Sequence, residues 1–416
     1  MKLLLKAVHI IDPGGKLHKQ TKDIFIEKGE IVKIGDKLNF EADKTISIEN
    51  LHVSKGWFDS SISFGEPGFE ERETLDNGLK VAAKSGFTAI ALNANTKPVP
   101  DNSSAISFFR NKTGLHGVGI YPKGALSPGA KGKDLAELFD MSKAGAVAFS
   151  DYKKPIGNPN LLKIALQYAQ GFDALVASYP QENAIATNGL VHEDTMSTHL
   201  GLKGIPALAE ELQIARDLFI LEYTGGKLHI PTISSKKSVQ LIKEAKEKGL
   251  DVSCSVAIAN LLFTDKELHD FDSKFKVLPP LRGKEDMLAL REGLKSGVID
   301  MLTCDHMPRT IEEKKVEFEN AAFGSIGLET AFAALRKIFD TETCIQFLTA
   351  GKTRFKIPNY AIAENQPAEL SFFLPNAEYN YQTNTLLSTS KNSIFTDTVL
   401  KGKTVGIFAN QKLSLF

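Results

Sequence analysis

The sequence has few cysteines, no excess of charge of either sign and no long apolar run. Its three cysteines, Cys254, Cys304 and Cys344, are odd in number and widely spaced, which excludes a disulfide framework and a paired-cysteine zinc motif. Lys plus Arg and Asp plus Glu number 50 each, so no chain-wide positive field attracts nucleic acid or an anionic membrane.

The apolar runs are all short. The opening MKLLLKAVHIIDPGG is interrupted by Lys6 and closed by Asp12 and Pro13, which favours a first strand over a signal peptide. No run approaches the roughly 18 apolar residues that span a bilayer. We therefore predict a cytoplasmic protein without membrane or nucleic-acid partners.

From about residue 53 the sequence alternates short β-rich runs with helical patterns. Eight such runs occur, and they are HVSKGWFD, GFTAIALNAN, HGVGIYPKG, GAVAFSDYK, FDALVASYP, KLHIPTIS, LDVSCSVA and VIDMLTCDH. Between the first two, Leu75, Leu79 and Ala83 share one helical face and Gly86 marks a stop. Eight βα repeats predict an α/β fold, a (β/α)8 TIM barrel over residues 53–360. The runner-up, a doubly wound open sheet, lacks a glycine-rich phosphate turn after its first strand.

The two ends of the chain have β patterns without intervening helices. At the start these are LLKAVHIID, KDIFIEKGEIVKIG and KTISIEN, and at the end LSFFLP, NTLLSTS and KTVGIFANQKLSLF. We therefore predict a small β-sandwich domain built from residues 1–52 and 361–416, flanking the barrel.

Active sites of such barrels lie at the C-terminal ends of the strands. The polar residues at those positions are Asp59, Ser61, Ser63, Asn93, Asn95, Asp151, Tyr179, Thr232, Asn260, Asp305 and His306. Most of these side chains are polar but chemically mild.

Several segments resemble one family in order along the chain. They are GEPGFEERET, NANTKPVPDN, GAVAFSD, LGLKGIPALAEE, PPLRGKED, DHMPRTIEEK, FGSIGLETA and SKNSIF. Together they resemble a dihydroorotase of the amidohydrolase superfamily from end to end. The resemblance implies a zinc-dependent cyclic amidase of pyrimidine biosynthesis, in which a metal-bound hydroxide acts on the ring of dihydroorotate.

The family's first strand ends in Asp-x-His-x-His followed by an arginine. The resemblance places Asp59, Ser61 and Ser63 in that motif and Gly65 at the arginine. It places Tyr179 and Thr232 where imidazole ligands follow the fifth and sixth strands. Two acids of the family pattern are retained, the bridging ligand Asp151 and the last ligand and proton shuttle Asp305.

Zinc favours nitrogen and sulfur donors, and a neutral hydroxyl is a poor substitute for imidazole. Coordination lowers the pKa of water from about 15.7 to about 7, so losing it removes up to roughly 12 kcal/mol of help in forming the nucleophile. We therefore expect no cofactor, although the parent family uses zinc. The vestigial metal positions are Asp59, Ser61, Ser63, Asp151, Tyr179, Thr232 and Asp305. A hard cation held by Asp59 and Asp151 is the less favoured interpretation, and so is Asp305 as a catalytic base.

The substrate-anchoring positions leave two interpretations open. The resemblance implies that Asn95 is retained, that the arginine is lost at Gly65, and that Arg309 replaces a histidine. Arg309 either grips a carboxylate in a bidentate manner or is an ordinary surface arginine.

Three functions follow from these observations. The leading hypothesis is a catalytically inactive structural or regulatory subunit, a homo-oligomer or a partner of aspartate carbamoyltransferase, with which some degraded relatives assemble. The second is an active cyclic amidohydrolase with an altered metal site. The third is a sensor that binds an anionic pyrimidine precursor through Asn95 and Arg309 without turnover.

Overall fold

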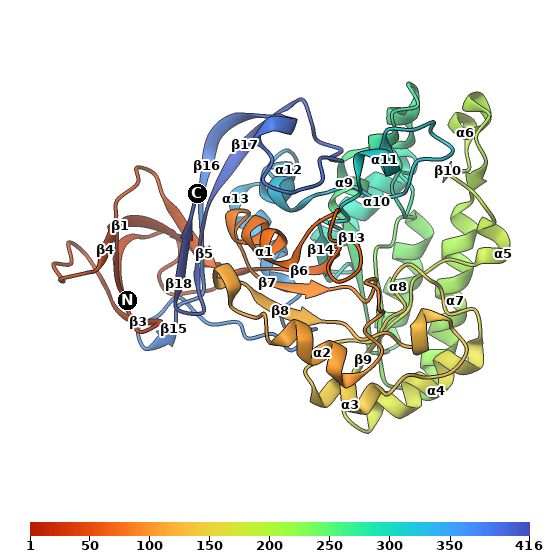
Figure 1. Cartoon of the computed structure of the whole chain (residues 1–416), viewed down its shortest axis with the longest axis horizontal. Coiled ribbons are helices and arrows are strands. Elements are labelled where there is room, and N and C mark those ends of the chain that lie inside the picture. Colours follow the sequence, from red (N-terminus) through yellow and green to blue (C-terminus); the bar gives the residue numbers. More distant parts are fainter.

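A computed structural model describes residues 1–416, and it consists of an α/β barrel with a β-sheet domain at one end (Figure 1). Both chain termini lie in the β-sheet domain, as predicted from the matching patterns of the two chain ends. None of the helices is both long enough and apolar enough to cross a membrane.

The barrel consists of two parallel sheets joined at their edges. Its strands are β6 (Trp57–Ile62), β7 (Phe87–Leu92), β8 (Gly119–Pro122), β9 (Leu175–Ala177), β12 (Lys227–Ile230), β13 (Val252–Ala257) and β14 (Met301–Thr303). Phe149 bridges Gly124 and Val176, so it supplies the fourth strand between β8 and β9. A parallel bridge from His306 to Ile62 closes the ring. The predicted closed barrel is confirmed, and the eight runs fall on its eight strand positions.

Helices surround the barrel, and several of them begin at capping side chains. They are α1 (Leu75–Lys84), α2 (Ser103–Arg110), α3 (Leu138–Lys143), α4 (Pro159–Gln170), α5 (Asn183–Ala186), α6 (Thr195–Leu200), α7 (Ala207–Thr224), α8 (Lys236–Glu247), α9 (Ile258–Leu262), α10 (Lys284–Lys295), α11 (Ile311–Lys314), α12 (Ala331–Leu335) and α13 (Thr341–Ala350). Thr74, Ser235 and Asp340 each accept a hydrogen bond from a first-turn N–H of the helix they precede. The short pair β10 (Val191–His192) and β11 (Gly204–Ile205) lies within the long interval between β9 and β12.

The β-sheet domain is a nine-stranded sheet contributed by both ends of the chain. Its strands are β1 (Lys2–Ile11), β2 (Thr21–Glu27), β3 (Glu30–Gly35), β4 (Lys44–Ile46), β5 (His52–Lys55), β15 (Gln366–Pro367), β16 (Leu370–Tyr381), β17 (Thr398–Ala409) and β18 (Lys412–Leu415). β5 pairs with β1 and with β16, so the sheet continues to Lys55, three residues past the boundary expected at 52. A separate apolar cluster that includes Leu5, Ile26 and Phe372 forms its core.

The tail segment NTLLSTS, residues 384–390, is not a strand, and that part of the prediction is wrong. Its backbone N–H groups bind carboxylates of the barrel instead of a neighbouring strand. Leu387 and Ser388 donate to Glu329, and Thr389 donates to Glu73 at 3.0 Å. Buried acids therefore satisfy the donors that a sheet ladder would have used.

Trp57, at the start of β6, packs where the barrel meets the sheet domain. Its wholly buried ring lies 5.9 Å from the ring of Phe87, 5.2 Å from Phe332 on α12 and 5.6 Å from Phe373 on β16. Gly86 has a φ of +87°, and a Cβ there would lie 2.6 Å from the Trp57 ring. The glycine that ends α1 is therefore required both by the turn and by this packing.

Candidate functional site at the barrel mouth

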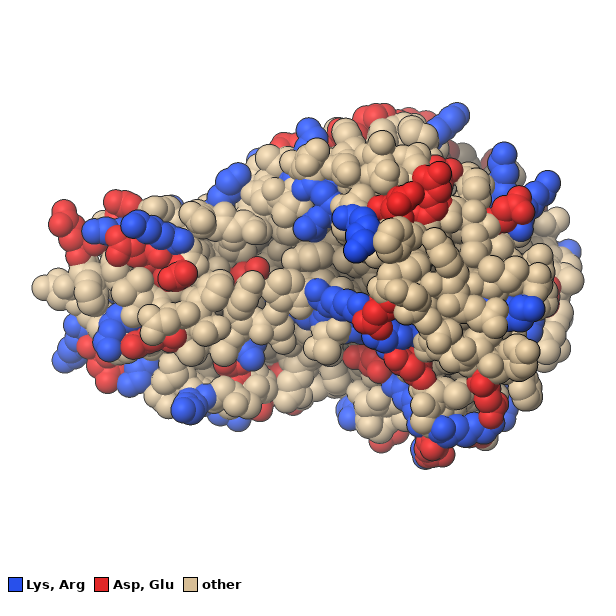
Figure 2. Space-filling model, turned by 90° about the horizontal axis from the view of Figure 1, so that it is seen from below, with Lys and Arg blue, Asp and Glu red and all other residues tan.

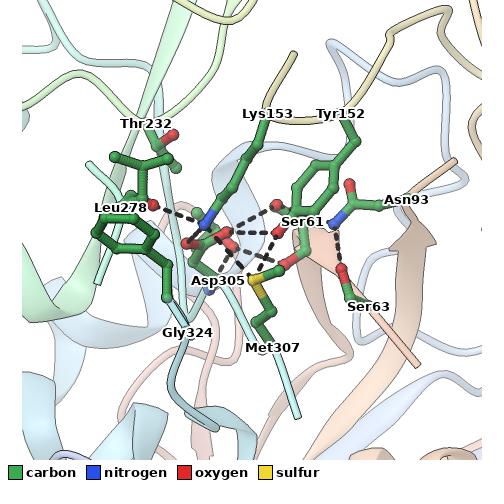
Figure 3. Close-up of polar contacts among 12 residues, drawn as sticks. Ser61, Ser63, Asn93, Tyr152, Lys153, Thr232, Leu278, Asp305, Met307 and Gly324 are labelled. Carbon is green, nitrogen blue, oxygen red and sulfur yellow. Dashed lines mark hydrogen bonds and ion pairs between the residues drawn. The ribbon is translucent and has the colours of Figure 1, made fainter. Parts of the chain in front are cut away.

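We call the region at the C-terminal ends of the barrel strands the barrel mouth. At its centre lies an ion pair between Lys153 and Asp305. Asp305 follows β14, and Lys153 follows the Phe149 bridge on the opposite part of the ring. Lys153 Nζ lies 2.7 Å from Asp305 Oδ2 and donates to the Leu278 carbonyl at 2.6 Å (Figure 3). The two charged side chains are only 10% and 12% exposed, so each depends on the other for compensation of its charge.

The second oxygen of Asp305 is also occupied. Ser61 Oγ donates to Asp305 Oδ1 at 3.2 Å, and the Tyr152 hydroxyl donates to the same oxygen at 3.4 Å. Tyr152 and Lys153 are adjacent, so the loop after the fourth strand contacts both carboxylate oxygens. Asp305 is thus fully engaged by groups of the chain itself.

A buried polar network continues from Ser61 toward β8. Asn93 Nδ2 donates to Ser61 Oγ at 3.2 Å and to Ser63 Oγ at 3.1 Å, and Lys123 Nζ donates to Asn93 Oδ1 at 2.9 Å. Burial lowers the pKa of Lys123 to about 8, although the charges of Asp59 and Asp305 oppose the shift. The hydroxyls at 61 and 63 therefore serve as hydrogen-bonding groups of a closed network.

Sequence reasoning did not single out Lys123, Tyr152 or Lys153. Both lysines were visible as cations at the ends of β-rich runs, in YPKG and SDYK, and Lys153 stands two residues after the retained Asp151. A cation at the end of a β-rich run, close to an acidic residue that also ends the run, was the available signal.

Asp59 connects two strands and does not point into an open site. Its Oδ1 accepts from Ser61 N at 2.9 Å and from Thr303 Oγ1 at 2.5 Å, and its Oδ2 accepts from Cys304 N at 2.7 Å. Burial raises the pKa of Asp59, while these hydrogen bonds favour the charged form and oppose that shift. The carboxylate therefore holds the end of β14 against β6.

Asp151 is also committed to the backbone. Its Oδ1 accepts from Leu126 N at 2.9 Å and from Ser127 N at 3.0 Å, and its Oδ2 accepts from the Ser127 hydroxyl. Burial raises its pKa, and the contacts with Ser127 and Leu126 act in the opposite direction. Asp151 therefore braces the loop after β8, and no hydrogen bond joins it to Asp305.

The positions after the fifth and sixth strands are buried and present no nitrogen donor. Thr232 is 2% exposed, its backbone has a φ of +52°, and its N–H donates to Ser255 Oγ at 3.1 Å. Tyr179 is 3% exposed, and burial, followed by the nearby charge of Asp305, raises the pKa of its phenol well above the usual value.

The two expected substrate anchors, Arg309 and Asn95, differ in how far their polar atoms are engaged. Arg309 Nε donates to the Phe323 carbonyl at 3.0 Å and Nη1 to Glu313 Oε1 at 3.0 Å, so most of its guanidinium is engaged. The thioether of Met307 lies 4.0 Å from both Arg309 Nη2 and Lys153 Nζ, and therefore stands between Arg309 and the ion pair. Asn95 is partly buried, and its Oδ1 has no hydrogen-bond partner.

Gly65 has no room for any side chain. A Cβ at this position would lie 1.7 Å from the Phe69 carbonyl oxygen, because the loop folds back and Phe69 N donates to Gly65 O at 2.9 Å. An arginine at 65 would require this loop to adopt another path.

The cavity that Asp305 lines is small. The cavity beside Asp305 measures about 20 Å³ and is lined by Ala257, Asn260, Leu278, Cys304, Asp305 and Gly327, among others. A buried water needs roughly 10–15 Å³, so this space accommodates about one water. A ring substrate does not fit in this cavity without displacement of the side chains that line it.

The chain is similar to dihydroorotases over almost its entire length. The family model described as Dihydro-orotase-like matches residues 42–238. The chain is 39% identical over 411 residues to the dihydroorotase of Pelotomaculum thermopropionicum, a match covering 97% of this chain and 96% of that protein. It is 38% identical over 413 residues to the dihydroorotase of Ruminiclostridium cellulolyticum, with 97% and 96% covered. The chain belongs to the dihydroorotase family.

Solved structures with the same fold come from neighbouring amidohydrolases. The L-hydantoinase of Arthrobacter aurescens superposes with a TM-score of 0.84 at 21% identity, covering 99% of this chain and 95% of that one. The dihydropyrimidinase of Brevibacillus agri gives 0.83 at 19% identity, covering 100% and 95%. At such identities the likeness establishes the barrel and β-sandwich fold of this dihydroorotase-family chain.

Dihydroorotases are generally zinc-dependent, and zinc in proteins is usually held by four ligands in a tetrahedron. Throughout residues 1–416, no three or more His, Cys, Asp or Glu side chains are grouped so that they could hold a metal ion. Asp59 and Asp151 bind backbone N–H groups, and Asp305 binds an ammonium. These donors do not fit a tetrahedral zinc site.

Proposed function

We propose that this dihydroorotase-family protein of pyrimidine biosynthesis has lost its zinc site and serves as a non-catalytic structural or regulatory subunit. The Lys153–Asp305 ion pair carries the proposal. An acid that moves a proton must reach the water or the substrate with a free oxygen. Here an ammonium and two hydroxyls occupy both oxygens of Asp305.

The position of the ammonium supports the same conclusion. The positive charge of Lys153, in place of a metal cation, compensates the negative charge of the Asp305 carboxylate. This charge cannot activate a water, because a protonated lysine has no acceptor or vacant coordination position. The chain thus keeps a folded barrel whose central acid is neutralised internally.

The competing function is hydrolysis by an altered site, and the full-length similarity to dihydroorotases favours it. Hydrolysis would require Lys153 to leave Asp305 and the mouth to open beyond its present cavity of about 20 Å³. The two functions therefore differ in the expected zinc content and in the expected rate of dihydroorotate hydrolysis.

We expect the purified full-length protein to contain less than one zinc per chain and to show no dihydroorotate hydrolysis above background. The physical reason is the absence of imidazole at Ser61, Ser63, Tyr179 and Thr232. Elemental analysis and a hydrolysis assay with added zinc test this, with the Pelotomaculum thermopropionicum dihydroorotase as positive control. Two tightly bound zincs per chain, or turnover comparable with the control, would contradict the proposal.

Restoring two imidazoles is expected to leave the protein inactive. In the double variant Ser61→His, Ser63→His, the ion pair still blocks Asp305, and Tyr179 and Thr232 still replace the other two ligands. Groups that act as a unit contribute non-additively, so half a ligand set gives no proportional share of the rate. Turnover by this variant in the same assay would show that the remaining positions matter less than we argue.

A folded barrel without catalytic activity can still provide a binding surface for another protein. We therefore propose assembly with aspartate carbamoyltransferase, or self-association, through an interface burying on the order of 1,200 Å² or more. Co-purification of the tagged full chain with recombinant transcarbamoylase tests the first assembly. Failure of the two proteins to co-elute at low ionic strength would remove that partner from the proposal.

A further inference from the structure

The outward face of α7 is apolar, which is unusual for a helix on a protein surface. Leu208, Leu212, Phe219 and Tyr223 are 55%, 46%, 73% and 79% exposed. Glu222 is the only other exposed residue of α7. The opposite face packs on the barrel and is already buried, through residues such as Ile214 and Leu221. Leu208, Leu212, Phe219 and Tyr223 form the outer stripe of α7. No part of the chain covers this stripe, so burying it requires another molecule.

The stripe follows from the sequence IPALAEELQIARDLFILEYTGG. At 100° per residue, Leu208, Leu212, Phe219 and Tyr223 fall within about 60° of one another, with Ala215 beside them. A helix that is apolar on both its inner and outer sides is typical of one covered on both sides. The face is therefore suited to a partner surface rather than to water.

The spacing of the stripe indicates which partner fits. The positions 208, 212, 219 and 223 are symmetric about the midpoint between Ala215 and Arg216. When two copies of one helix pack antiparallel about a two-fold axis at that midpoint, Leu208 meets the other copy's Tyr223, and Leu212 meets its Phe219. A two-fold interface must be self-complementary, and here each leucine is placed opposite an aromatic ring. We propose that α7 is the centre of a two-fold homodimer interface of this protein.

The available apolar surface is of the right size. An aromatic side chain buries roughly 150–250 Å². With exposures of 73% and 79%, Phe219 and Tyr223 supply on the order of 600 Å² across two copies. A specific interface needs about 1,200 Å², and the leucines and the neighbouring helices contribute to the remainder.

The stripe is bordered by an apolar groove and by charged side chains, as is typical of a protein interface. A groove of about 120 Å³ between α7 and α8 is lined by Ala215, Leu218, Phe219 and Leu241, and can receive an apolar side chain of the second copy. At its edge Lys248 pairs with Glu222 at 3.3 Å, which places charge at the border. On the face shown in Figure 2, charges of both signs are interspersed, and uncharged surface covers much of the end where α4 and α7 lie in Figure 1.

This inference deepens the proposed structural role by naming a surface and a partner, a second copy of the chain. The tests of the two ideas are separate. Sedimentation of the pure protein measures self-association, and the zinc and hydrolysis measurements test the loss of catalysis. A monomer without activity would overturn the interface alone, and an active dimer would overturn the non-catalytic role alone.

A charge-swap experiment tests the pairing in the full-length protein. We expect the unmodified chain to sediment as a dimer, and Leu212→Glu or Phe219→Lys alone to weaken dimerisation at least tenfold by placing buried, unpaired charges in the interface. The double variant Leu212→Glu, Phe219→Lys should regain most of the association, because the two-fold axis pairs the opposite charges twice. Helices packed in parallel would bring like positions together and give no such rescue.

The matched control is Leu288→Glu, which changes an apolar residue on α10 that is 48% exposed and lies outside α7. It should leave the sedimentation coefficient unchanged, and circular dichroism should show that all variants are folded. A monomeric parent chain, or a dimer that withstands both single variants, would overturn the proposal. A parent chain that is monomeric alone and uses α7 only to bind a transcarbamoylase would overturn it as well.

Discussion

Replacing Lys153 with methionine is expected to destabilise the folded state by about 3–5 kcal/mol, the usual effect of removing one partner from a buried ion pair. Asp305, which is 12% exposed, would lose the ammonium that lies 2.7 Å from Oδ2. The methionine keeps the apolar stem, so the loss reports on the charge and on the hydrogen bond to Leu278. Urea denaturation at neutral pH measures the change in the free energy of unfolding.

Two controls make this result specific to the buried pair. The double variant Lys153→Met, Asp305→Asn removes both charges and should recover a substantial part of the stability. Lys243→Met breaks an exposed pair with Glu247, whose side chains are 59% and 63% exposed, and should change stability by less than about 1 kcal/mol. Equal effects of Lys153→Met and Lys243→Met would show that the mouth is hydrated and open, and would weaken the proposed function.

Acid is expected to destabilise the protein through His306, and the loss begins at a pH above that at which carboxylates titrate. Burial lowers the pKa of this imidazole to about 3. Its Nδ1 accepts from the N–H of Gly327 at 3.3 Å and of Leu328 at 3.5 Å, so a proton on Nδ1 would displace both contacts. Nε2 has no hydrogen-bond partner, and protonation therefore gains none.

The sign follows from linkage. The imidazole is neutral when folded and takes up a proton when unfolded, near an ordinary pKa of about 6.5. Its contribution to stability is fully present above that value and is lost as the pH falls toward the folded-state pKa of about 3. At about pH 4 the loss attributable to His306 is about 3 kcal/mol, since each pKa unit corresponds to about 1.36 kcal/mol.

Thermal unfolding from about pH 7 to about pH 4 measures this loss. The variant His306→Gln cannot take up the proton and should show a shallower decline, whereas His269→Gln, at a residue 66% exposed, should follow the parent curve. Residual decline in His306→Gln is expected, because burial also lowers the pKa of His229 well below its usual value. Parallel curves for the parent chain and His306→Gln would contradict the assignment.

The sequence was sufficient to predict the barrel because strand runs, helical faces and turn residues are local patterns. It was not sufficient to predict where the acids point. Asp59 and Asp151 stand at strand ends, as expected, but each binds N–H groups of a loop that is distant in sequence from its own. A position at a strand end determines where the Cα atom lies, whereas the nearby N–H donors determine the direction in which the carboxylate points.

The same limit applies to Lys153. Its backbone has a φ of +53°, an uncommon conformation for a residue with a side chain, and its partner Asp305 lies 152 residues further along the chain. Neither feature has a local sequence signal. The tail segment 384–390 failed as a strand prediction for a related reason, since its partners are the carboxylates of Glu73 and Glu329 on the barrel.

Trp57 is the only tryptophan of the chain, and its position makes it a built-in optical reporter. Because the indole touches Phe87 of the barrel, Phe332 of α12 and Phe373 of the sheet domain, its emission responds to solvent entering the junction between them. Fluorescence follows the separation of the two domains, whereas far-ultraviolet circular dichroism follows the helices around the barrel. Coincidence of the two signals during denaturation reveals whether barrel and sheet unfold as one cooperative unit, without any label being added.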